Sequence, residues 1–147
     1  MTRWLLDTCV VSELRKPAVR MNPHVHAWAA TLDTASAYLS AITISELSTW
    51  AAIVSTRGDA VQAALLDTWL RDYVLAHFDG RILAVDTDVA LTAGRLHVPD
   101  PRDYRDAFIA ATALCHDLTV VTRNTADFAS VGVRLLNPFE TGMADSA

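Results

Sequence analysis

Short apolar runs alternate along the chain with longer stretches whose apolar residues recur at helical spacing. The short runs predict strands at residues 4–6, 37–40, 81–85, 118–122 and 133–136. The longer stretches predict helices at residues 10–15, 26–32, 43–56, 59–77, 86–97 and 104–115. Continuous apolar strands that alternate with helices are typical of a parallel sheet with helices on both faces. We therefore expect an α/β fold with a central, mainly parallel sheet of about four to five strands.

Composition favours a single compact domain over residues 1–147, because 52% of the side chains are apolar and can form a core. Cys9 and Cys115 form neither a CxxC pair nor a zinc-binding spacing, which favours a reduced chain. Asp7 interrupts the first apolar run too early for a signal peptide, and no uncharged apolar run is long enough to span a membrane. We expect a cytoplasmic protein with no membrane partner.

The net charge of −5, from 12 basic and 17 acidic residues, argues at first against a nucleic-acid partner. However, four of the acids follow predicted strand ends. Asp7 ends the first strand, Glu46 lies in the first turn of the helix after the second strand, and Asp106 opens the helix after a loop at 98–103. Asp127 follows the strand at 118–122. If the strands are parallel, these acids converge at one edge of the sheet.

Four clustered carboxylates would repel one another unless cations offset their charge. Oxygen ligands suit hard cations, and Mg²⁺, with Mn²⁺ as a substitute, best fits a site that keeps water and binds a substrate phosphate. Two such ions, about 4 Å apart, would activate a water and stabilise the leaving oxygen of a phosphodiester. They would also offset most of the net charge. The acidic composition is thus compatible with a metal-dependent nuclease.

Each acid also has an ordinary structural interpretation. Asp7 fits a helix N-cap, and residues 43–46 match a capping box in which Glu46 folds back on its own helix. Asp106 would complement the helix dipole behind Asp103 as cap, and Asp127 would cap a short turn. Spacing alone leaves both interpretations open.

The sequences around these acids resemble, in order, the motifs of PIN-domain nucleases. The segments that carry the resemblance are residues 5–14, 40–47, 106–113, 120–128 and 136–140. They span nearly the whole chain and are most similar to the VapC-type toxins of bacterial toxin–antitoxin pairs, in particular the FitB-like branch. The resemblance implies a PIN fold, a divalent-metal site, and an endoribonuclease that leaves 5′-phosphate and 3′-hydroxyl ends.

The resemblance also assigns roles by position. Asp7, Glu46 and Asp106 match the core metal-binding acids, and Asp127 matches the more variable fourth acid. Two further polar residues match supporting positions, Thr122 and Asn124. The family often has Asn where this chain has Cys9, and a thiol cannot make the same amide hydrogen bonds.

The family implies four partners: a cognate antitoxin, an RNA substrate, a second copy of the chain in a homodimer, and operator DNA bound only through the antitoxin. An alternative is a PIN-fold binding module that acts mainly through its antitoxin and DNA complex and cleaves little RNA. Four arginines flank the proposed site and are candidates for RNA phosphate contacts, with solvated surface positions as the alternative: Arg95, Arg102, Arg105 and Arg123. Trp50 and Trp69 fit either an interface or the core.

Two other enzyme or signalling classes are disfavoured. Asp86-Thr87-Asp88 imitates the aspartyl nucleophile of haloacid-dehalogenase-type phosphatases, but too little chain follows it, and Asp86 also fits a helix cap. A receiver-like signalling domain needs a lysine near the end of a late strand. The one lysine of this chain, Lys16, lies in the first predicted helix.

Overall fold

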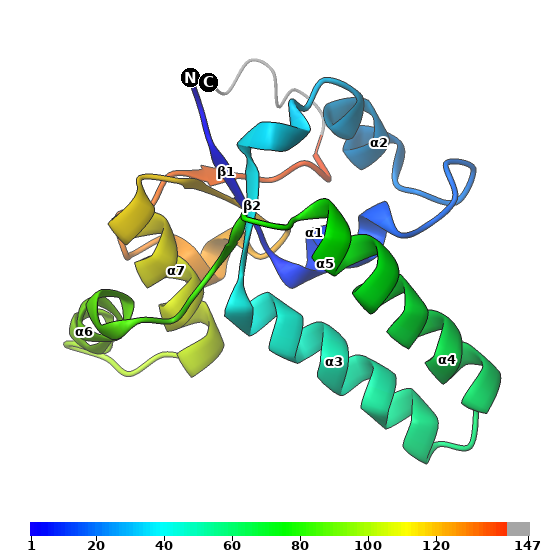
Figure 1. Cartoon of the computed structure of the whole chain (residues 1–147). Helices are drawn as coiled ribbons and strands as arrows, with labels where there is room; N and C mark the ends of the chain where they lie inside the picture. Colours follow the sequence, from blue (N-terminus) through cyan, green and yellow to red (C-terminus); the bar gives the residue numbers. More distant parts are fainter. Residues whose placement is uncertain (141–147) are drawn as a thin grey trace.

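Five parallel strands form one sheet in the order β3-β2-β1-β4-β5 in the computed structural model, which describes residues 1–140 (Figure 1). The strands are β1 (Trp4–Leu6), β2 (Ala37–Ser40), β3 (Ile82–Leu83), β4 (Thr119–Val121) and β5 (Leu135–Leu136). Leu5 pairs with Tyr38 on one side and with Val120 on the other. The predicted α/β class and parallel sheet are confirmed, although β3 and β5 are shorter than their apolar runs.

The helices alternate with the strands, as the hydrophobic pattern predicts. They are α1 (Thr8–Leu14), α2 (Pro23–Ala30), α3 (Ala41–Thr56), α4 (Ala60–Thr68), α5 (Leu75–His77), α6 (Thr87–Leu96) and α7 (Tyr104–His116). The helix predicted at 59–77 is one helical path whose middle, Trp69–Val74, is a π-helix. α2 begins before the predicted residue 26 because the Asn22 side chain accepts hydrogen bonds from the backbone N–H groups of His24 and Val25.

The central strand is buried on both faces. Leu6 packs with α1 and the helical segment 69–78, whereas Leu5 packs with α7 and Phe128. Successive side chains of a strand point to opposite faces, so Leu5 and Leu6 are buried in two different hydrophobic cores. This double burial explains why β1 reads as an uninterrupted apolar run.

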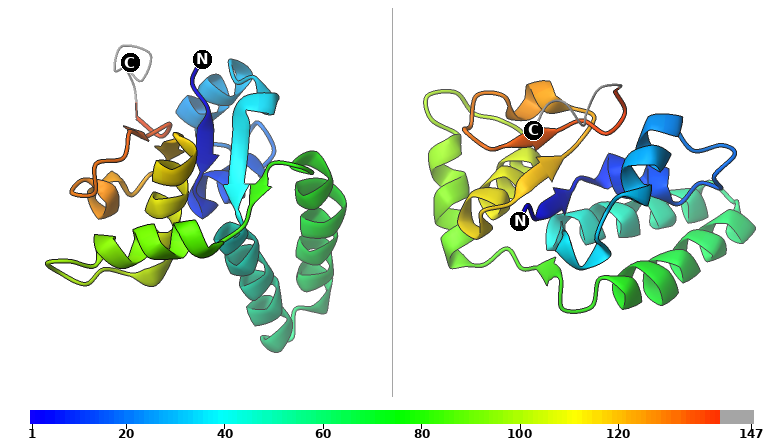
Figure 2. Two further views of the ribbon diagram at one scale, coloured as in Figure 1. Left: turned by 60° about the vertical axis from the view of Figure 1, so that its left-hand side comes forward. Right: turned by 90° about the horizontal axis from the view of Figure 1, so that it is seen from above.

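The helices lie in distinct groups around the sheet. α6 packs against α7 on one side, with Ala93, Ala107 and Ala111 allowing close approach (Figure 2). α3 and α4 run side by side and extend beyond the sheet as an arm (Figure 1). Among the helices of residues 1–140, none has the length and apolar character needed to cross a membrane.

Arg81 ties the end of this arm to the sheet. Its guanidinium donates to the backbone carbonyls of Ala37 (2.6 Å), His77 (2.5 Å) and Thr34. Its Cζ also lies 5.1 Å from the ring centroid of Phe78. One side chain therefore joins the start of β2 to the end of α5.

We predict that Arg81→Ala lowers the free energy of unfolding by about 2 kcal/mol, because three carbonyls lose a charged donor. Urea denaturation measures the change. Arg71→Ala is the control and should cost no more than about 0.5 kcal/mol, since the ion pair of Arg71 with Asp67 lies on the surface. If both variants lost the same free energy of unfolding, the role given to Arg81 would be contradicted.

Candidate active site

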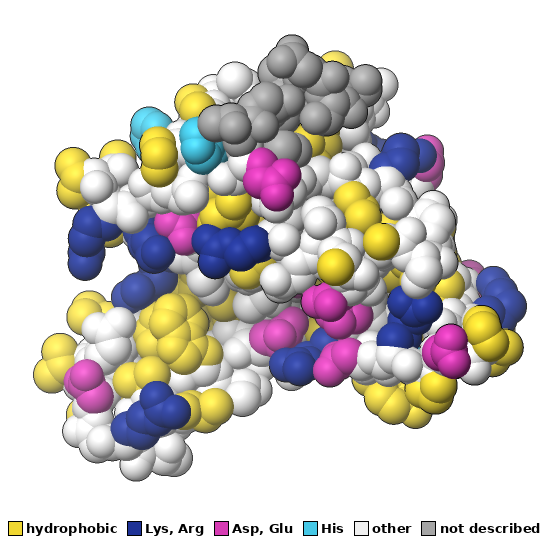
Figure 3. All heavy atoms as spheres, turned by 180° about the vertical axis from the view of Figure 1, so that it is seen from behind, with side chains coloured by type: hydrophobic (Ala, Val, Ile, Leu, Met, Phe, Trp, Pro, Cys, Tyr) yellow, Lys and Arg dark blue, Asp and Glu magenta, His cyan; other side chains and the backbone are white. Residues whose placement is uncertain are grey.

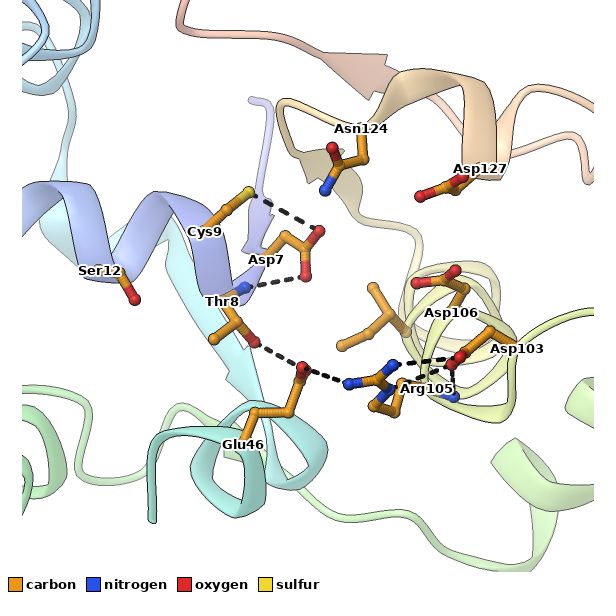
Figure 4. Close-up of a pocket in the computed structure, with 11 residues that line it drawn as sticks. Asp7, Thr8, Cys9, Ser12, Glu46, Asp103, Arg105, Asp106, Asn124 and Asp127 are labelled. Atoms are coloured by element: carbon orange, nitrogen blue, oxygen red, sulfur yellow. Dashed lines mark hydrogen bonds and ion pairs between the residues drawn. The ribbon is translucent and has the colours of Figure 1, made fainter. Parts of the chain in front are cut away.

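A pocket of about 510 Å³ opens beyond the carboxyl ends of β1, β2 and β4, within the size range of ligand sites. Its walls hold five carboxylates contributed by four separate segments (Figure 4). They belong to Asp7, Glu46, Asp103, Asp106 and Asp127. The four acids singled out in the sequence thus share one pocket, and Asp103 joins them.

Asp7 lies directly beyond β1, and its carboxylate is held on both oxygens. Oδ1 accepts from the backbone N–H of Thr8 at 2.8 Å, so Asp7 caps α1 as expected. Oδ2 accepts from the Thr122 hydroxyl at 2.7 Å, and Thr122 Oγ1 in turn accepts from the backbone N–H of Asn124 at 3.0 Å. Asp7 can therefore cap α1 and face the pocket at the same time, and Thr122 supports it from the residue directly after β4.

Cys9 occupies the position at which the family often has Asn. Its Sγ lies 4.0 Å from Asp7 Oδ2 and 3.8 Å from Thr122 Oγ1. Burial, and then the charge of Asp7, raises the pKa of the Cys9 thiol. Cys9 is therefore a neutral neighbour of Asp7.

Glu46 reaches the pocket from the second turn of α3, and its expected capping box does not form. The helix starts two residues before the predicted residue 43 because the Ser40 side chain caps it by accepting from Ile42 N–H. Thr43 is instead fully buried inside α3. The Thr8 hydroxyl donates to Glu46 Oε1 at 2.8 Å and so aims this carboxylate into the pocket.

Asp106 and Asp127 face the pocket from its opposite side (Figure 4). Asp103 caps α7 by accepting from Arg105 N–H, which places Asp106 in the first turn, as expected. Asp127 lies in a 3₁₀ helix, Thr125–Phe128, where it is not the cap that the sequence suggested, because Asn124 holds the N-cap position.

The surroundings of Asp106 disfavour its charged form. Burial raises the pKa of Asp106 to about 6, and the charges of Asp127, Asp103 and Asp7 add to the rise. Arg105 opposes it and also pairs with Asp103 at 3.2 Å and with Glu46 at 3.5 Å. A site that makes an aspartate this hard to ionise favours the binding of a compensating cation.

The donor chemistry fits a hard divalent cation. The donors are carboxylate oxygens together with the Asn124 amide, and the neighbouring thiol is neutral. Within residues 1–140, no three histidine, cysteine, aspartate or glutamate side chains lie close enough to enclose an ion by themselves. Mg²⁺ commonly takes only one or two carboxylates and keeps several waters, so the donor types remain compatible with it.

The four arginines named from the sequence separate into different environments. Arg105 lines the acidic pocket, and Arg123 lines the groove next to it. Arg102 donates to the carbonyl of Leu96 and to the Ser130 hydroxyl, and Arg95 donates to Thr92 on its own helix. The structure thus brings Arg105 to the acids and gives Arg102 a role in holding the loop before α7.

Sequence reasoning missed two site residues. Thr8 orients Glu46, and Asp103 adds a fifth carboxylate besides capping α7. Asp103 was recognisable only as a cap. Asp86, by contrast, caps α6 by accepting from Val89 N–H at 3.0 Å, in agreement with its structural interpretation.

Comparison with known proteins agrees with this geometry. A family model described as the PIN domain matches residues 4–133. The chain is 36% identical over 145 residues to Toxin FitB of Neisseria gonorrhoeae, covering 92% of this chain and 97% of that protein. It is 32% identical over 141 residues to the VapC ribonuclease Y4jK of Sinorhizobium fredii, covering 92% and 97%. The structure of FitAcB from Neisseria gonorrhoeae matches with a TM-score of 0.84 at 35% identity, over 93% of this chain and 99% of that one.

The chain belongs to the PIN-domain family. Its relatives include ribonucleases, and ribonucleases of this family generally use a divalent metal. The family assignment made from the motifs is therefore confirmed. The roles of the individual acids remain predictions.

We predict that Asp106→Asn stabilises the metal-free protein at pH 7.5. Because folding raises the pKa of Asp106 from 3.8 to about 6, the folded state binds this proton more tightly, and its stabilising effect disappears as the pH rises through 6. Replacing the ionised group should therefore raise the unfolding free energy by about 1–2 kcal/mol at pH 7.5, after allowance for solvent screening.

Urea denaturation in EDTA at pH 7.5 and pH 4 tests this prediction. The difference between Asp106→Asn and the parent should shrink at the lower pH, at which the parent's Asp106 is protonated. A destabilised variant at pH 7.5 would show that burial and the neighbouring charges do not disfavour ionised Asp106 in the folded protein.

Proposed function

We propose that this protein is a metal-dependent endoribonuclease and the toxin of a type II, VapBC-like toxin–antitoxin pair. The observation that carries the proposal is the convergence of Asp7, Glu46, Asp106 and Asp127 in one pocket. The curated relatives named as a toxin and as a VapC ribonuclease support the same function.

In this proposal, Asp7 and Asp106 hold a Mg²⁺ ion, for which Mn²⁺ can substitute, and Glu46 and Asp127 complete the site. When bound, such an ion supplies Lewis acidity, which lowers the pKa of water and neutralises charge that develops on a phosphate. Phosphodiester hydrolysis of this kind expels the 3′ oxygen and leaves 5′-phosphate and 3′-hydroxyl ends.

The protein's own residues prepare this reaction. Thr122 and the backbone N–H of Thr8 fix both oxygens of Asp7, and the Thr8 hydroxyl fixes Glu46. These hydrogen bonds leave each carboxylate in one orientation before substrate arrives, which reduces the reorganisation needed during reaction. Arg105 is the basic side chain closest to the acids through its pairs with Glu46 and Asp103, and we assign it to an RNA phosphate.

Partners of the relatives suggest partners for this chain. One similar structure, at 33% identity and a TM-score of 0.83, is FitAB bound to an IR36 DNA fragment. We propose a cognate antitoxin as the protein partner, operator DNA bound only through that antitoxin, and a homodimer of this chain. We also propose a cytoplasmic location, in which RNA and antitoxin are both accessible.

The alternative is a binding module that acts through its antitoxin and DNA complex with little RNA cleavage. The two functions make different demands on the acids. A binding module does not need four carboxylates around one pocket, nor does it need the hydrogen bonds that orient two of them. The intact acid cluster therefore favours the nuclease.

We predict that the purified, antitoxin-free protein cuts total bacterial RNA into discrete fragments in Mg²⁺ or Mn²⁺ but not in EDTA. Asp106→Asn should lower the rate at least about 100-fold, because one ligand of the ion is lost while the fold is retained. Gel electrophoresis and end mapping measure cleavage, and circular dichroism checks the fold.

The matched control is Asp88→Asn, an exposed acid in the first turn of α6. It should cleave at the parent rate. Normal cleavage by Asp106→Asn would refute the site assignment. A folded parent that cleaves no RNA in either metal would favour the binding module.

A further inference from the structure

A second groove, of about 1100 Å³, lies next to the acidic pocket and shares Cys9 and Ser12 with it. One wall is the end of α1 with the loop that follows it, and the other is formed by the α3–α4 arm and Trp69. In Figure 3, basic side chains gather above a hollow at the left, hydrophobic ones lie below it, and acidic ones cluster to its right. The groove is thus continuous with the candidate active site but opposite to it in charge.

Two tryptophans and an arginine form the centre of this groove. The guanidinium carbon of Arg15 lies 5.9 Å from the ring centroid of Trp50 and 5.7 Å from that of Trp69. Trp50 remains 36% exposed although it is a large apolar residue. Trp69 starts the π-helix, a distortion that is frequent at functional sites. Flat aromatic and guanidinium surfaces of this kind are what unpaired bases stack on.

Basic groups line the rest of the groove in an otherwise acidic protein. Lys16 is neutralised by buried Glu13, at 3.0 Å, so within residues 1–140 the free positive charge of the groove comes from Arg15, Arg20 and Arg123. Arg123 stacks on Phe139, with its Cζ 3.8 Å from the ring centroid. It directly follows Thr122, the residue that holds Asp7. Positive charge therefore begins beside the acids and continues along the groove.

We propose that this groove binds the single-stranded RNA that leads away from the cleavage site, with bases stacked on Trp50 and Trp69 and phosphates paired with Arg15, Arg20 and Arg123. The proposal rests on the proposed nuclease function and states where its substrate runs. The groove supplies the attraction for phosphate that the acidic pocket lacks, so binding and chemistry are separated in space.

A protein partner is the other class of ligand that a groove of this kind could accept. The charge favours RNA, because three free arginines and no unpaired acid line its walls among the described residues. An apolar pocket suited to a protein side chain adjoins the groove at Arg15 and Trp69. Its apolar lining, which includes Leu6, Leu14, Val74 and Phe78, distinguishes it from the basic groove. We therefore assign the basic aromatic groove to nucleic acid.

The test measures binding of a short, fluorescein-labelled single-stranded RNA of mixed sequence by anisotropy. All variants carry Asp106→Asn, so that no strand is cut, and a salt series is run in EDTA. Arg20→Ala should weaken binding at least about threefold and reduce the slope of log affinity against log salt by about 0.7, because one phosphate contact is lost. Trp50→Ala should weaken binding at least about fivefold at an unchanged slope, and Trp50→Phe should restore most of it.

Two controls match these variants outside the groove. Arg3→Ala removes an arginine at the amino end of β1, whereas the acidic pocket lies at its carboxyl end, and Tyr73→Ala removes an exposed aromatic residue. Both should bind RNA as the Asp106→Asn parent does. Thermal unfolding of every variant verifies that a loss of affinity is not a loss of fold.

Without the Asp106→Asn change, Trp50→Ala should raise KM with kcat nearly unchanged. The assignment of the groove to RNA would be overturned if Arg20→Ala and Trp50→Ala bound RNA as tightly as the parent. It would also be overturned if these variants lost antitoxin binding but kept their RNA affinity. If the protein bound RNA through these residues but cleaved none, the proposed nuclease function would be refuted, whereas the proposed RNA-binding role of the groove would be supported. The two proposals can therefore fail separately.

Discussion

The parallel pairing of β1 with β2 and β4 is the constraint on which the site depends. Leu5 and Leu6 are buried in cores on opposite faces, and this double burial resists a shift in register. The backbone N–H of Asp7 then continues the ladder by donating to the carbonyl of Val121 at 2.9 Å. That single hydrogen bond sets Asp7 beside Thr122, whose hydroxyl orients its carboxylate. The geometry of the acids is therefore a consequence of strand register.

The cost of this arrangement is electrostatic. Asp106 lies in the first turn of α7, where a helix dipole favours negative charge, yet its pKa is raised to about 6 by burial and neighbouring acids. Burial, together with repulsion from the neighbouring acids, outweighs the dipole's effect on the pKa of Asp106, and Arg105 offsets it only in part. The pocket therefore lowers the stability of the folded state, as is common where residues are selected for chemistry. A divalent cation bound as proposed would offset the negative charge of these acids.

Much of this site could be predicted from the sequence, for a physical reason. Acids at the ends of apolar strands converge when the strands are parallel. The placement of Asp7, Asp106 and Asp127 in one site could therefore be predicted from the hydrophobic pattern and the motifs. Glu46 was placed one turn too early because Ser40, not Thr43, caps α3. The groove was not predictable. Arg15 comes between Trp50 and Trp69 only because the α3–α4 arm folds back beside the end of α1, and no local pattern encodes that packing.

The most direct test of the metal-dependent site is a crystal of the protein soaked in Mn²⁺, measured at a wavelength at which manganese scatters anomalously. We expect an anomalous peak in the acidic pocket, within coordination distance of Asp7 and Asp106, that disappears in Asp106→Asn crystals. An occupied Mn²⁺ site elsewhere, or a pocket without a peak at saturating Mn²⁺, would show that these acids do not form the metal site.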